Sequence, residues 1–158
     1  MNIEGNPTMS VFDLTFVLCA VIFNLLIIGI YISSRHELVG LRSTLGKIVI
    51  ALGIPLSVVF IEYAVTGRPA RILLYTAFIL IYLVVEIVLD FVLKIEFRKK
   101  PVLHIPYIVL FYAASFGLVG VSFSINETWG YIVATTFWGV LGSLVYFLLG
   151  GMKKRAQR

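Results

Sequence analysis

The sequence predicts an all-α polytopic membrane protein, a bundle of five transmembrane helices with its N-terminus outside and its C-terminus in the cytoplasm. Hydrophobic residues make up 60% of the 158 residues, charged residues make up 13%, and the mean hydropathy is +1.02. Soluble domains contain roughly 45–50% apolar residues. The apolar residues are grouped in long runs, and the basic residues lie between these runs. A water-soluble fold is therefore excluded.

Five of the apolar runs are long enough to cross a bilayer, which takes roughly 20 residues of helix for about 30 Å of hydrocarbon. The first run is followed, not preceded, by basic residues and has no small-residue cleavage site. We therefore expect it to remain as a helix of the mature protein. The runs form a single transmembrane domain over residues 1–158, with predicted spans 11–32, 45–66, 72–95, 102–124 and 129–149.

The segments between the spans carry residues that end or begin helices. Within the second span, Pro55 removes one backbone hydrogen bond and leaves the carbonyl of Ala51 unpaired, so we expect a polar opening beside the helix. The fourth and fifth spans contain small residues that allow close helix packing, and we expect these two helices to form a tight hairpin. The small residues are Ala113, Gly117 and Gly120 in the fourth span and Gly130, Ala134, Gly139 and Gly142 in the fifth.

The basic residues predict the orientation. Eleven of the 13 Lys and Arg residues lie in or beside the loop after the first span, in or beside the loop after the third span, or in the C-terminal tail. In a topology with five spans, these three regions lie on the same side of the membrane. The opposite side has only Arg68 and Arg71. Lys and Arg are enriched on the cytoplasmic side of membrane proteins, so the basic side is predicted to be cytoplasmic. This topology explains the net charge of +5, and no nucleic-acid partner is needed.

Apart from Asp13, which lies at the start of the first span and is counted with the outer face, three carboxylates lie inside the predicted spans: Glu62, Glu86 and Asp90. An ionisable group in a membrane helix is costly to insert, so each needs a partner, an aqueous cavity or a function. Asp90 precedes Lys94 by four residues, the favourable order for an ion pair along a helix. Basic residues in the following loop predict a secondary polar site formed by Glu62, Arg68 and Arg71.

Glu86 has Tyr82 and Asp90 one turn away on either side and lies close to the middle of its predicted span. With a rise of about 1.5 Å per residue, residues of the other spans can be assigned to similar depths. From these depths we expect a ligand-binding polar pocket in the cytoplasmic half of the bundle. Its predicted residues are Asn24, Tyr82, Glu86, Asp90, Tyr107, Tyr112 and Tyr146.

The sequence contains no Gly-rich phosphate loop, no nucleophile elbow and no histidine pair at metal-binding spacing. Cys19 is the single cysteine, which excludes a disulfide within the chain. The sequence therefore names no catalytic residue, no cofactor and no metal site. His104 opens the fourth span near the level of Asp90, and it is an interfacial candidate for acid–base chemistry on a lipid headgroup.

Three classes of function remain open from the sequence. The first is a protein that binds or transports a proton, a cation or a small cationic or lipidic ligand at the Glu86 pocket. The second is an accessory or assembly subunit whose buried polar residues determine packing. The third is a lipid-modifying membrane enzyme. The expected surroundings are the lipids of the cell membrane, and both a homo-oligomer and a larger membrane complex remain open.

Overall fold

The computed structural model describes residues 9–93 and 101–156, and for residues 90, 91, 101, 103, 104 and 150–156 it describes the backbone only. Five helical segments of this part are long and apolar enough to cross a membrane, so the chain is an integral membrane protein with several spans. The elements are α1 (Val11–Arg35), α2 (Val39–Ala51), α3 (Gly53–Val65), α4 (Ala70–Glu86), the π-helix η1 (Ile87–Val92), α5 (Pro101–Ile125) and α6 (Glu127–Ala156).

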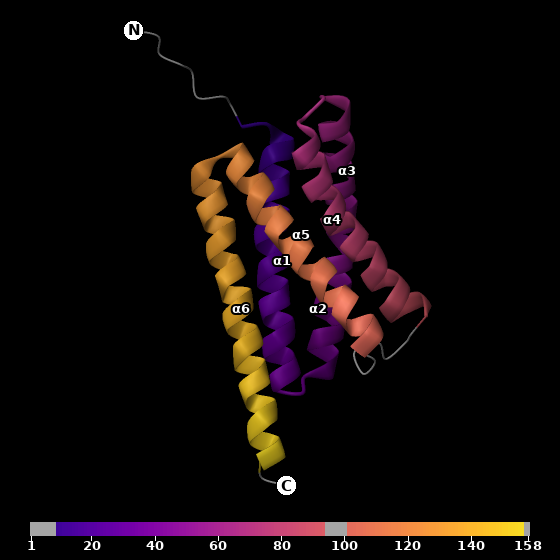
Figure 1. The fold of residues 1–158 in the computed structure, drawn as a ribbon, viewed down its shortest axis with the longest axis vertical. Coiled ribbons are helices and arrows are strands. Elements are labelled where there is room, and N and C mark those ends of the chain that lie inside the picture. The colour runs from indigo at the N-terminus through magenta and orange to yellow at the C-terminus, as the bar shows by residue number, and fades with distance from the viewer. Residues whose placement is uncertain (1–8, 94–100, 157–158) are drawn as a thin grey trace.

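Helix α1 runs through the middle of the bundle and contacts α2, α3, α5 and α6. Helices α4 and α5 pack against each other and are inclined to α1 and α6 (Figure 1). The N- and C-termini lie at opposite ends of the bundle (Figure 1). The core along α1 consists of fully buried apolar side chains, among them Phe16, Val17, Ala20 and Phe23.

Helix α1 begins at a capping box. The Ser10 hydroxyl accepts a hydrogen bond from the Asp13 amide at 3.1 Å, and the Asp13 carboxylate accepts one from the Ser10 amide at 3.3 Å. These reciprocal bonds satisfy amides that have no partner in the first turn of a helix. At its other end, α1 is joined to α2 by residues 36–38, with Glu37 in the left-handed region at φ 59°. Helix α2 therefore begins six residues before the predicted span at Leu45.

The second span is broken at Leu52, which separates α2 from α3. Pro55 has no amide hydrogen to bond the carbonyl of Ala51, and this explains the break. At Gly53, next to this break, the nearest atom to a built Cβ is the apolar Cδ1 of Leu83, at 3.5 Å. The polar opening expected beside Pro55 stays a prediction.

Helix α4 changes into the π-helix η1 directly after Glu86. The Leu93 amide donates to the Val88 carbonyl at 2.8 Å, five residues back, which is the hydrogen-bonding pattern of a π-helix. This widening alters the four-residue spacing on which the predicted pair of Asp90 and Lys94 depends. Lys94 and the side chain of Asp90 lie outside the described residues.

The glycines of α5 face α4, whereas the sequence assigned them to the contact with α6. A Cβ at Gly117 would lie 2.9 Å from the carbonyl oxygen of Tyr75, and one at Gly120 would lie 3.2 Å from the Tyr75 ring. On α6, a Cβ at Gly139 would lie 2.9 Å from Ile28 of α1, and Gly130 faces the ring of Phe123 on α5. Helices α5 and α6 do contact each other. The closest backbone approach at these small residues is between α4 and α5.

Gly67 in the turn between α3 and α4 adopts a backbone conformation that favours glycine, and its substitution can be tested. Gly67 has a φ of +68°, and nothing lies within 4 Å of a Cβ built there. An alanine in this conformation is disfavoured by roughly 1–2 kcal/mol because its Cβ crowds the following carbonyl. We expect Gly67→Ala to lower the free energy of unfolding in detergent by about 1 kcal/mol. The control is Gly46→Ala in α2, where a Cβ also meets nothing within 4 Å and the expected change is zero or a small stabilisation.

Candidate functional site

Three hydrogen-bonding side chains, here called the carboxylate–phenol cluster, join α4 to α5. The Tyr107 hydroxyl donates to the Glu86 carboxylate, with 2.5 Å between Oη and Oε2. The Tyr107 and Tyr82 hydroxyl oxygens are 2.9 Å apart, and either group can be the donor. A hydroxyl that bonds an ionised carboxylate at roughly 2.5–2.7 Å makes a charge-assisted hydrogen bond, about twice as strong as a neutral one. The cluster therefore places an acid in direct contact with a chain of two phenols.

Aromatic rings enclose the inner end of this cluster. Tyr82 is only 2% exposed. Its ring centroid lies 5.9 Å from Phe23 of α1 and 5.5 Å from Phe111 of α5, both in edge-to-face arrangements. Tyr31 of α1 is near enough to interact electrostatically with Tyr82. Glu86 itself is half-buried. The phenol chain thus leads from a partly exposed carboxylate to the buried aromatic side chains of the core.

The cluster lies where α4 changes into η1. Glu86 is the last residue of α4, and Tyr107 is six residues after Pro101, where α5 begins. Both residues lie within candidate membrane spans. Depth counted along the helices put Glu86 closer to the middle than Tyr107, whereas the hydrogen bond between them places the two side chains at one level.

Asn24, expected in the same pocket, bonds α6 instead. Its Nδ2 donates to Thr136 Oγ1 at 2.9 Å and to the Val133 carbonyl at 3.3 Å. The residue is 1% exposed, and its Oδ1 has no hydrogen-bond partner among the described residues. Asn24 therefore links α1 to α6 in the middle of the span.

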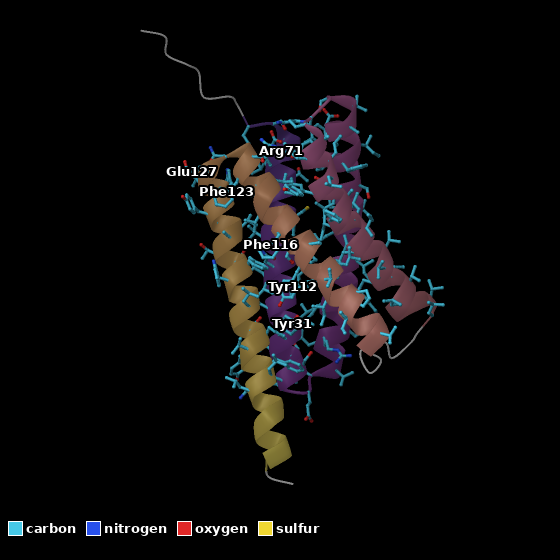
Figure 2. The ribbon with its side chains drawn as sticks, in the orientation of Figure 1. Tyr31, Arg71, Tyr112, Phe116, Phe123 and Glu127 are labelled. Atoms are coloured by element: carbon cyan, nitrogen blue, oxygen red, sulfur yellow. The ribbon has the colours of Figure 1, made fainter. Side chains whose placement is uncertain are left out.

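The remaining predicted pocket residues are spread over other contacts. Tyr112 is half-buried with its ring 5.4 Å from Phe111, and it lies on the same half of the bundle as Tyr31 (Figure 2). Tyr146 is 43% exposed; its ring lies 3.7 Å from the guanidinium carbon of Arg35, whose Nη1 donates to the Tyr146 carbonyl. The side chains of Asp90 and His104 lie outside the described residues.

A second polar cluster, the N-terminal cluster, lies at the end of the bundle that carries the N-terminus. Arg68 Nη2 contacts the two carboxylate oxygens of Asp13 at 3.0 and 2.8 Å. The Tyr63 hydroxyl donates to Asp13 Oδ1 at 2.9 Å. The Arg68 guanidinium carbon lies 5.3 Å from the centroid of the Tyr63 ring. The side chain of Asp13 is 8% exposed and that of Arg68 is 35% exposed.

This cluster replaces the secondary site expected from sequence. Arg68 pairs with Asp13, and no ion pair of Glu62 is formed among the described residues. Glu62 is half-buried in α3, and Arg71 is exposed at the N-terminal end of the bundle (Figure 2). From the sequence, Asp13 was expected only as a charge of the outer face. The spacing of Ser10 and Asp13 is that of a capping box, and this signal could have placed Asp13 at the start of a helix.

Two further features bear on ligand binding: the arrangement of metal-ligating residues and a groove on α6. In the part of the chain that the structure describes, no group of three or more His, Cys, Asp or Glu residues is arranged to hold a metal ion. A groove of about 410 Å³ lies on α6, and it is lined by Thr128, Tyr131, Ile132, Thr135 and Thr136. The carboxylate–phenol cluster combines an ionisable group with a chain of two hydrogen-bonded phenols inside the spans.

No family model matches this chain, and no curated protein or solved structure is significantly similar to it. The fold and the cluster define the class: a polytopic integral membrane protein with a carboxylate hydrogen-bonded to a chain of two phenols inside its spans.

Proposed function

We propose that the protein binds a cation at Glu86 within the membrane, as a receptor or as part of a transport process. The hydrogen-bond chain from Glu86 through Tyr107 to Tyr82 is the observation that carries this proposal. Intramembrane carboxylates are costly and usually mark an ion or proton site. The half-buried position of Glu86 at the end of α4 leaves part of its side chain accessible to a ligand.

Ligand-dependent stability tests this function. A ligand that binds only the folded protein adds about 1.4 kcal/mol to the free energy of unfolding at ten times its Kd. We expect such stabilisation of the wild-type protein in detergent with at least one of three probes: protons, alkali cations or small organic ammonium ions. Glu86→Gln should abolish it, because the amide has the shape of the carboxyl group but no charge.

Glu62→Gln is the matched control. Glu62 is also a half-buried membrane glutamate, but it lies in α3 and outside the cluster. This variant should keep the full ligand-dependent stabilisation. Equal responses of the wild type and Glu86→Gln to all three probes would refute cation binding at Glu86.

The orientation belongs to the same proposal. The bias of Lys and Arg supports an external N-terminus and a cytoplasmic C-terminus in the cell membrane. With this orientation Glu86 would be reached from the cytoplasm. Reporter domains fused to the C-terminus should be active only if they function in the cytoplasm, and activity of a reporter restricted to the outside would reverse the orientation.

The second candidate function is that of an accessory subunit, and the groove on α6 favours it. Three of its five lining side chains are exposed hydroxyl-bearing residues, Thr128, Tyr131 and Thr135. Hydroxyls and small residues are common where membrane helices of different chains meet. An accessory subunit should be extracted by mild detergent with a second polypeptide, and native mass spectrometry of the extract would detect it.

A further inference from the structure

We infer that the cation exchanged at Glu86 is a proton, taken up from the membrane face nearest the cluster, with the chain of Tyr107 and Tyr82 hydrogen-bonded to Glu86 both before and after uptake. This inference rests on the proposed function and names its ligand. It depends on how the side chains pack around the cluster and on the direction in which the phenol chain can donate.

The packing of the cluster favours a proton over a larger cation. Tyr82 touches three aromatic rings, those of Phe23, Tyr107 and Phe111, with centroids between 5.5 and 5.9 Å away. These separations are those of rings in direct contact. A metal or organic cation at the phenols would have to separate them, whereas a proton on Glu86 requires no displacement of heavy atoms.

The hydrogen-bond chain can accept a proton by reversing its direction. With Glu86 ionised, Tyr107 donates to the carboxylate and accepts from Tyr82. When a proton binds the carboxylate, the new carboxyl group donates to Tyr107, whose own hydroxyl hydrogen turns toward Tyr82. Each oxygen keeps a partner within the 2.5 and 2.9 Å contacts, and both phenols keep their protons. The bound proton neutralises the charge and no other bond is made or broken.

Among the described side chains, the titratable groups of the cluster come from different helices: Tyr82 lies on α4 and Tyr107 on α5. Tyr31 on α1 lies within electrostatic range of Tyr82. Asp90 follows one turn later on η1, with its side chain outside the described residues. The change to a π-helix begins at the residue after Glu86, and such segments often occur at functional sites because they redirect the residues that follow.

Proton uptake measured directly tests the inference. Protein in detergent is stepped between alkaline and acidic pH in weak buffer, and the protons bound are counted with an indicator dye. Carboxyl protonation is followed by infrared difference spectroscopy. We expect Glu86→Gln to take up about one proton fewer per chain than the wild type and to lose one carboxyl band. Glu62→Gln should lose a different band or none.

A second variant separates a site effect from loss of folding. Tyr107→Phe keeps the ring and removes the hydrogen bond to the carboxylate, so uptake should persist with its midpoint moved to higher pH. If Glu86→Gln and the wild type bind equal numbers of protons, and Tyr107→Phe has an unchanged midpoint, the proton is not the ligand. Stabilisation by an alkali or ammonium ion that still depends on Glu86 would then leave the proposed function standing. Loss of both responses would remove the function as well.

Discussion

Replacing Arg68 with alanine is expected to lower the free energy of unfolding by about 3 kcal/mol. The reason is that a buried ion pair that loses one partner leaves an uncompensated charge, a change that typically costs about 3–5 kcal/mol. The carboxylate of Asp13 is 8% exposed and contacts Arg68 at 2.8 Å. Tyr63 and the Ser10 amide would still donate to it, which places the expected value at the lower end of this range.

The two members of the pair should not be equivalent. Arg68 is 35% exposed and can turn toward water when its partner is removed, whereas Asp13 is held inside by α1. Asp13→Asn should therefore cost less than Arg68→Ala. Chemical or thermal unfolding of both single variants and the double variant gives the coupling energy. Arg71→Ala is the matched control, because Arg71 is exposed and should contribute little. If Arg68→Ala lowers the free energy of unfolding no more than Arg71→Ala does, the ion pair of Arg68 and Asp13 does not stabilise the fold.

The spans were predictable from the sequence because hydrophobic length alone sets them. Each of the five predicted runs overlaps a helical segment long and apolar enough to cross a membrane, and Ala51, whose carbonyl was expected to lose its partner to Pro55, is the last residue of α2 before the break. Helix ends were less predictable. Helix α2 begins at Val39, because the chain reverses direction over residues 36–38 with Glu37 in the left-handed region. The π-helix after Glu86 had no signal in the sequence, since its residues are as apolar as those of an ordinary helix.

The site was predicted in part, and geometry explains which part. Glu86, Tyr82 and Tyr107 were expected in one pocket, and they form one hydrogen-bonded cluster. Asn24 and Tyr146 lie in other contacts, because depth along a helix gives a level but no direction around the axis. Asp13 was missed as a partner of Arg68 because the two are 55 residues apart, and only the packing of α1 against α3 brings them together.

Gly117→Ala is expected to be the most damaging of the glycine substitutions at the contact between α4 and α5, at about 2 kcal/mol. A Cβ at this position would lie 2.9 Å from the carbonyl oxygen and 3.4 Å from the Cα of Tyr75. Backbone atoms of a packed helix cannot turn away as a side chain can, so α4 and α5 would have to separate. Overfilling a packed contact in this way typically costs about 1–3 kcal/mol.

The neighbouring glycines provide a graded control series. A Cβ at Gly120 meets the Tyr75 ring at 3.2 Å, one at Gly139 meets the flexible end of Ile28, and one at Gly142 meets nothing within 4 Å. The expected loss of stability in detergent therefore falls from Gly117→Ala through Gly120→Ala and Gly139→Ala to Gly142→Ala, which should be neutral.

Because α4 and α5 also carry Tyr82 and Tyr107, separating them lengthens the phenol chain. Gly117→Ala should thus weaken the Glu86-dependent response as well, although it lies ten residues from Tyr107. Full retention of that response together with wild-type stability would show that the close approach of α4 and α5 does not hold the cluster together.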